Sequence, residues 1–129
     1  MSLTVSDSPH SVAETIDRLL GALERRKVQV FARIDHAAGA RDAGLELADE
    51  QLLIFGDPRV GTVLMQSDRA IGYELPLRVL AWEQAGQTKV GYRRPSELAD
   101  DYAVADRSEV LERMDSLLGQ LVAESVATS

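Results

Sequence analysis

The stretch "QLLIFGDPRVGTVLM", residues 51 to 65, changes at Gly56 from an apolar run to a segment that begins with aspartate and proline. Residues 51 to 56 form a nearly continuous apolar run, which predicts a central strand covered on both faces or nearly so. Gly56 permits a sharp exit from that strand, Asp57 is placed to cap a helix, and Pro58 has the fixed φ favoured at a first helical position. The stretch therefore predicts a strand that leads directly into a helix.

Two longer segments have the apolar spacing of helices that pack on a core. Residues 11 to 27 repeat apolar side chains at helical spacing, and Ser11 with Glu14 matches a capping box at their start. Residues 107 to 125 continue a stripe of the same kind. We expect both helices to pack on a sheet through these one-sided stripes.

Strand patterns and turn residues fill the space between these helices. The other strand-like segments are residues 2 to 6, 28 to 34, 78 to 83 and 88 to 93. Gly86 supplies the turn of a hairpin, and Asp35 is placed to cap a short helix that Gly44 ends in a left-handed conformation. The order predicts a single α+β domain over residues 1 to 129, with two layers and the helices packed on one face of a mainly antiparallel sheet.

Composition narrows the classes of function. The 129 residues are 45% hydrophobic and 27% charged, as in ordinary globular domains, and the formal net charge is −7. That charge repels nucleic acid and anionic membranes, and the bases form no run that would offset it. The chain has no cysteine, which excludes disulfides and thiolate chemistry. We find no leader pattern and no apolar span of bilayer length, so we expect a cytoplasmic protein.

Three blocks of the sequence resemble the domain of unknown function 302 family. They are "VFARIDHAAGARDAGLEL" (residues 30 to 47), "LLIFGDPRVGTVLMQ" (residues 52 to 66) and "YELPLRVLAWE" (residues 73 to 83). The resemblance implies a compact two-layer α+β domain, often homodimeric, with no established activity and no catalytic residue to carry over. The family commonly has asparagine where this chain has Asp57, a change that preserves capping but alters a neutral ligand contact.

The predicted helix start after residue 56 is the first candidate site. Free backbone N–H groups there, joined by the Thr62 hydroxyl and by Arg59, are typical of a pocket for a small polar or anionic ligand. The alternative is that Asp57 already satisfies these groups and that the glycines and Thr62 only permit close packing. Of the two aromatic residues on the hairpin, Tyr92 and Trp82, one is a candidate to line a cleft or a subunit interface.

His36 is the candidate for acid/base chemistry because it follows Asp35 at the start of a predicted helix. A general base needs a carboxylate to orient it, for which Asp35, Asp57 and Glu83 are candidates. Because Asp35 and Asp57 each follow a strand, we expect the two junctions to meet at one sheet edge and share a pocket in which His36 titrates. No nucleophile motif, metal-ligand spacing or cofactor motif accompanies them, so we expect neither metal nor cofactor.

The sequence is compatible with two functions. One is a homodimeric module that binds a small polar or anionic ligand or a protein partner, and the other is an acid/base enzyme that uses His36 with a nearby carboxylate. The apolar residues 63 to 65 and the hairpin are the candidate surfaces for the homodimer.

Overall fold

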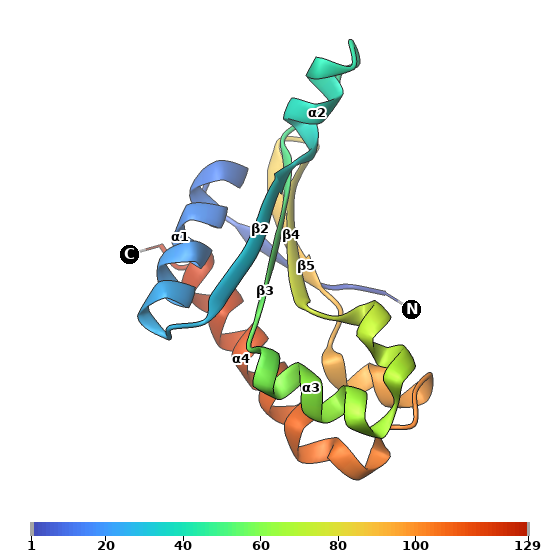
Figure 1. Ribbon diagram of the computed structural model, residues 1–129. Helices are drawn as coiled ribbons and strands as arrows, with labels where there is room; N and C mark the ends of the chain where they lie inside the picture. The colour runs from blue at the N-terminus through green and yellow to red at the C-terminus, as the bar shows by residue number, and fades with distance from the viewer. Residues whose placement is uncertain (1, 129) are drawn as a thin grey trace.

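The structure, a computed structural model, describes residues 2–128 and forms two layers, a five-stranded sheet with helices on one of its faces (Figure 1). In chain order the elements are β1 (Thr4–Ser8), α1 (Val12–Arg25), β2 (Gln29–Asp35), α2 (His36–Asp42), β3 (Glu50–Gly56), α3 (Pro58–Ser67), the 3₁₀ helix η1 (Arg69–Glu74), β4 (Leu77–Gln84), β5 (Gln87–Tyr92), the 3₁₀ helices η2 (Pro95–Asp100) and η3 (Ala105–Arg107), and α4 (Ser108–Ser125).

The sheet is antiparallel throughout and its strands lie in the order β1-β5-β4-β3-β2. The expected hairpin joins β4 to β5, where Ala85 and Gly86 both have positive φ, 52° and 78°. Gly44 follows α2 with φ 78°, as its predicted place after that helix requires. The predicted α+β class, with helices on one face of an antiparallel sheet, is therefore confirmed.

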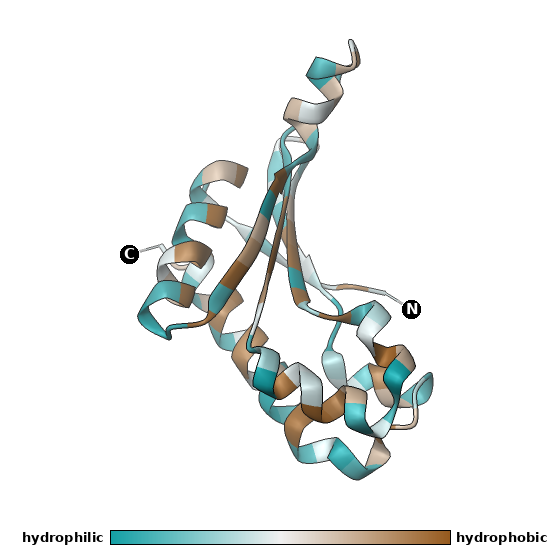
Figure 2. Cartoon of the chain, in the orientation of Figure 1, coloured by the Kyte–Doolittle hydropathy of each residue, from teal (hydrophilic) through white to brown (hydrophobic). Residues whose placement is uncertain are grey.

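The core lies between α1, α4 and the face of the sheet that they cover. Ile16 and Leu19 of α1 and Phe55 of β3 are fully buried there. The Glu14 backbone N–H donates to Ser11 Oγ at 3.1 Å, so Ser11 caps α1 as predicted. The two long helices bury their apolar stripes as the spacing predicted, and Figure 2 shows hydrophobic segments on both helices.

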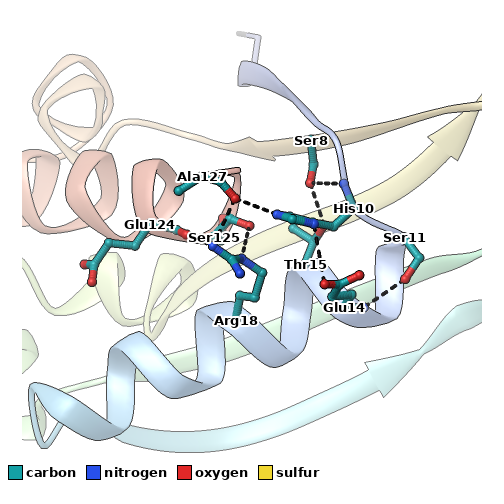
Figure 3. Close-up of polar contacts among 9 residues, drawn as sticks. All are labelled: Ser8, His10, Ser11, Glu14, Thr15, Arg18, Glu124, Ser125 and Ala127. Carbon is teal, nitrogen blue, oxygen red and sulfur yellow. Dashed lines mark hydrogen bonds and ion pairs between the residues drawn. The ribbon is translucent and has the colours of Figure 1, made fainter. Parts of the chain in front are cut away.

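A polar network ties the start of the chain to its last helix (Figure 3). Arg18 donates from Nε to the Ser125 carbonyl at 3.2 Å and from Nη2 to the carbonyls of Glu124 and Ala127, at 3.3 and 3.0 Å. His10 Nε2 lies 2.6 Å from the same Ala127 oxygen. The last carbonyls of a helix have no partner within it, so Arg18 satisfies them and complements the negative end of the helix dipole.

Two further contacts support this end of the helix layer. The hydroxyls of Ser8 and Thr15 share a buried hydrogen bond of 2.7 Å, which joins β1 to α1. Glu124 pairs with Arg26 and, at 3.0 Å, with Arg25, and these two guanidinium groups hold the pKa of its carboxyl below the usual value. α1 is thereby attached to β1 through Thr15 and, at its end, to α4.

The second face of the sheet is not covered by a helix within the described residues, and this differs from the expectation for β3. Leu53 and Phe55 point into the core and are fully buried, whereas Leu52 and Ile54 point the other way and are half-buried. β3 is therefore covered on one face only. Its continuous apolar run arises because its outward positions are apolar too, not because a second layer covers them.

Gly91 lies on this uncovered face beneath the Trp82 side chain. A Cβ atom at Gly91 would lie 3.1 Å from the indole and 3.2 Å from Leu3 Cδ1. We expect Gly91→Ala to lower the free energy of unfolding by about 1–3 kcal/mol, because the indole has to move away from the sheet. Urea denaturation measures the loss.

Gly39→Ala is the matched control for that change. Gly39 is in α2, and a Cβ atom there would meet no other atom within 4 Å. Alanine is favoured over glycine within a helix, so this control should leave stability unchanged or raise it by up to about 1 kcal/mol. Equal effects of the two substitutions would show that the indole does not restrict residue 91.

Candidate functional site

The junction between β3 and α3 has the local structure that its sequence predicts. The Asp57 side chain accepts from the Arg59 backbone N–H at 2.9 Å, and Pro58 begins the helix. The Asp57 carbonyl accepts from the N–H groups of Val60 and Gly61 at 3.0 and 3.1 Å. The capping role of Asp57 is confirmed, and these helix-start donors are engaged within the chain.

The side chains at this helix start are also engaged with one another. Thr62 donates its hydroxyl to the Pro58 carbonyl at 2.6 Å. Arg59 pairs with Asp57 through two hydrogen bonds of 3.2 Å, although the Arg59 side chain is 91% exposed. Hydrogen bonds from the Arg59 side chain and backbone hold the pKa of the Asp57 carboxyl below its usual value. This arrangement leaves few free donors for an anion.

A pocket of about 320 Å³ opens beside the junction, on the side of the sheet that the helices cover. Four segments that are far apart in the sequence form its wall. They are β2 with the residue before it, the first half of α3, the end of η1 with the Leu75-Pro76 peptide, and the middle of α4. The Leu75-Pro76 peptide is cis. Its apolar wall includes Val28, Phe31, Met65, Leu75, Met114 and Leu117. The polar side chains that line it are Asp57 and Thr62, both already hydrogen-bonded.

Glycines keep this pocket open. A Cβ atom at Gly61 would lie 3.6 Å from Leu75 Cδ1 and 3.8 Å from Met65 Cε, which are ordinary contacts in the pocket wall. At Gly72 a Cβ atom would lie 3.1 Å from the sulfur of Met65, so any side chain there would displace it. Gly61 and Gly72 therefore have a spatial reason, because larger side chains at either position would fill the pocket or displace its wall.

Asp35 and His36 lie far from this pocket. Asp35 accepts from the Ala38 N–H at 2.9 Å and caps α2, as predicted. His36 is the first residue of α2 and is exposed, and its side chain makes no hydrogen bond or ion pair among the described residues. α2 projects beyond the end of the sheet (Figure 1).

The expectation that the two junctions share a pocket is wrong. Asp35 pairs with Gln51 near the start of β3, whereas Asp57 follows the end of β3. Six residues of strand span about 20 Å. The strands β2 and β3 are antiparallel, so their carboxyl ends lie at opposite ends of the sheet. The two junctions would lie at the same end only if the strands were parallel.

Tyr92 lies in the core, away from the pocket. It ends β5 and is 9% exposed, and its hydroxyl lies near Gly119 of α4. Burial, and then the nearby Asp115 carboxylate, raise the pKa of its phenol. Trp82, the other aromatic candidate on the hairpin, lies on the uncovered face of the sheet instead.

A second hollow, of about 380 Å³, lies between η1, the ends of β4 and β5, η2 and α4. Arg93 pairs there with Glu74 at 2.8 Å and with Asp101 at 2.9 Å, and the Tyr102 hydroxyl donates to Glu74 at 3.0 Å. Partial desolvation and this hydrogen bond raise the pKa of Tyr102. Arg93 is shared by two carboxylates from different segments, so the cluster fastens the 3₁₀ segment η1 and the turn after η2 to the end of β5.

Residues 2–128 lack the features of two other kinds of site. Histidine, aspartate and glutamate side chains nowhere gather there in the groups of three that would hold a metal ion. None of the helices in this range has the length and apolar character that a membrane crossing requires.

Fold and pocket together define a two-layer α+β domain with an apolar pocket at a strand-to-helix junction. The chain belongs to the family described as "Domain of unknown function DUF302", whose pattern it matches over residues 4–121. A crystal structure of an uncharacterized conserved DUF302 protein from Bacillus stearothermophilus has the same fold. It superimposes with a TM-score of 0.74 at 20% identity and covers 98% of this chain and 96% of that one.

Similar sequences also occur within longer proteins. The chain is 45% identical over 109 residues to proteins named fluoride-specific ion channel FluC 1, from Brucella suis and Brucella abortus. The match covers 84% of this chain but only 43% and 40% of those two proteins. The chain thus spans less than half the length of these relatives.

Several pocket residues were not expected from the sequence. Met114 and Leu117 belong to the apolar stripe of α4 and look like core residues, and Phe31 looks like one residue of a strand. Phe31 follows Val30 at a point where the pairing register of β2 and β3 shifts, and it is 46% exposed. A bulge of this kind redirects a side chain and leaves no clear mark in a single sequence.

Proposed function

We propose that this domain is a binding module whose pocket beside the β3–α3 junction accepts a small ligand with an apolar body. The observation that supports the proposal is the pocket of about 320 Å³ that the "FGDPRVGTVLM" stretch forms with α4 and β2. This volume lies near the lower end of the roughly 300–1,000 Å³ typical of small-molecule sites. The ligand is therefore small.

The wall chemistry indicates what kind of ligand fits. Met65 and Met114 supply flexible, polarisable side chains, and Phe31 supplies an aromatic face. The donors expected to bind an anion are instead bonded to Asp57 and Pro58, and the carboxylate of Asp57 would repel a second negative charge. We infer that affinity comes from burial of apolar surface, and that a polar end of the ligand, where present, stays near the solvent.

The acid/base alternative has less support. His36 lines neither of the two hollows described above, and no carboxylate within the described residues orients its ring. General base catalysis requires both a positioned base and a substrate site within hydrogen-bond reach. The name of the Brucella relatives describes proteins more than twice as long as the matched segment, so it does not support fluoride conduction by this chain.

The methionine methyl groups provide a direct test of the pocket. Met65 and Met114 both line it, and the sequence contains only three methionines, so methyl-labelled protein gives a spectrum that is simple to follow. We expect titration with indole and with octanol to shift the signals of Met65 and Met114 in a saturable way.

A blocked pocket provides the mutational test. Gly61→Leu places a side chain between Leu75 and Met65, and we expect it to reduce the affinity for the bound probe at least tenfold. Stability should be retained, because replacing glycine within a helix gains up to about 1 kcal/mol. Gly39→Leu makes the same substitution in α2, where a Cβ atom meets open space, and should leave binding unchanged.

The comparison of the two leucine variants separates binding from folding. Equal binding by Gly61→Leu and the unchanged protein would refute the pocket, as would the absence of any saturable methyl shift with either probe. If Gly61→Leu proves unstable, Gly61→Ala adds only a methyl group at ordinary contact distances, and a smaller loss of affinity is then expected.

A further inference from the structure

The second hollow, between η1, the ends of β4 and β5, η2 and α4, has an apolar floor beside exposed side chains. Leu77 of β4, Leu98 of η2 and Leu118 of α4 line it and are buried. Tyr73 and Arg78 line it too and are exposed, the tyrosine to 85%. The hollow therefore joins an apolar surface to an aromatic ring and a guanidinium group that solvent reaches.

Two arginines lie next to each other at this hollow. Leu80 pairs with Gly91, and the same register continued by two residues places Arg78 beside Arg93. Arg93 is already bound by the two carboxylates described above. The Arg78 side chain makes no hydrogen bond or ion pair among residues 2–128. Its positive charge is therefore available to a ligand, whereas the charge of Arg93 serves the fold.

The charge of the hollow does not follow from the composition of the chain. The sequence has 21 acids and 14 bases, yet the charged residues that line the hollow are two arginines and Glu74. The pocket beside the β3–α3 junction has the opposite character, because its charged lining residue is Asp57. The two hollows therefore favour ligands of different charge.

We propose that the second hollow binds a small carboxylic acid with an aromatic body. The carboxylate pairs with the Arg78 guanidinium, and the ring stacks on Tyr73 and covers the leucine floor. The volume of about 380 Å³ lies within the range of small-molecule sites and suits one ring with a short acidic side chain. The proposal does not depend on the pocket beside the β3–α3 junction.

The ion pair and the apolar contacts have separate roles in this site. Arg78 is exposed, and water and salt weaken exposed ion pairs, so most of the affinity comes from burial of the ring. Arg78 instead supplies a preference for the acid over a neutral analogue of the same shape. An amine finds no free carboxylate here, because Glu74 is bound by Arg93 at 2.8 Å and by the Tyr102 hydroxyl at 3.0 Å.

Titration with phenylacetate and with its neutral amide, phenylacetamide, followed by nuclear magnetic resonance, tests the proposal. We expect the unchanged protein to bind the acid about three- to tenfold more tightly than the amide. Arg78→Gln should remove that preference, and Arg78→Lys, which keeps the charge, should retain part of it. Arg41→Gln makes the same change of charge at an exposed position of α2, outside both hollows, and should leave the preference intact.

Two further variants locate the site. Tyr73→Ala removes the exposed aromatic face and should weaken binding of phenylacetate about threefold or more without loss of stability. Leu77 lines both hollows, so the two sites have to be distinguished directly. Gly61→Leu blocks only the pocket beside the β3–α3 junction and should leave phenylacetate binding unchanged.

The methionine methyl signals provide a second measurement that needs no variant. Met65 and Met114 line the other pocket and not this hollow, so phenylacetate should saturate its site without shifting their signals as indole is expected to do. Four results would overturn the proposal. They are the absence of saturable binding of phenylacetate, equal affinity for the acid and the amide, a preference for the acid that survives Arg78→Gln, and loss of phenylacetate binding in Gly61→Leu.

Discussion

Replacing Phe55 by alanine is expected to lower the free energy of unfolding by about 3–5 kcal/mol. Phe55 ends β3 and is fully buried between the sheet and the helices, so its removal leaves a cavity that the rigid strand cannot close. Domains of this size are typically stable by only about 5–15 kcal/mol, so a large share of the stability would be lost. Urea denaturation and thermal melting both measure the change.

The chain contains a matched control for this experiment. Phe31 is the other of its two phenylalanines, is 46% exposed and lines the pocket. We expect Phe31→Ala to cost about 1 kcal/mol or less in stability but to weaken binding of indole. The two substitutions should thus separate folding from binding, and a stability loss from Phe31→Ala as large as that from Phe55→Ala would contradict the burial described here.

The second large effect is expected at Arg18. Arg18→Ala removes the donors to two carbonyls at the end of α4 and to the Ala127 carbonyl just beyond it. It should lower stability by about 2–3 kcal/mol, because hydrogen bonds from a charged donor contribute more than neutral ones. Arg18→Lys should recover only part of the loss, since an ammonium group cannot match the planar guanidinium that reaches all three oxygens.

Arg59→Ala is the control for charge removal. The Arg59 side chain is 91% exposed and, within residues 2–128, pairs with the neighbouring Asp57 alone, so its loss should leave the urea midpoint nearly unchanged. Urea denaturation of the three variants at one pH makes the comparison. Equal effects at residues 18 and 59 would show that the network at the end of α4 does not stabilise the fold.

Much of the fold was predictable because it depends on local patterns. The stripe of α1 with its Ser11 cap, the hairpin at Gly86 and the left-handed Gly44 each follow from residues close together in the sequence. Strand direction was not predictable in this way. The junctions at Asp35 and Asp57 look alike in sequence, yet the antiparallel pairing of β2 and β3 places them at opposite ends of the sheet.

The candidate site was predicted only in part, for a related physical reason. The stretch around Asp57 was identified because glycine and proline restrict the backbone locally. The rest of the pocket wall includes Phe31, Leu75 and Met114, which are apolar residues of the same types that fill protein cores. Whether such a side chain faces the core or a hollow depends on tertiary packing, which periodicity does not encode.

The position of β1 in the sheet has a consequence for the order of events during synthesis. β1 pairs with β5, so Thr4 lies opposite Tyr92, whereas β2 to β5 each pair with the strand that follows or precedes them in the chain. Bringing β1 to its partner closes a loop that contains almost the whole sheet, which is slower than forming the local hairpins. Residues 4 to 8 therefore leave the ribosome before β5 does, and they can join the sheet only after β5 has been synthesised.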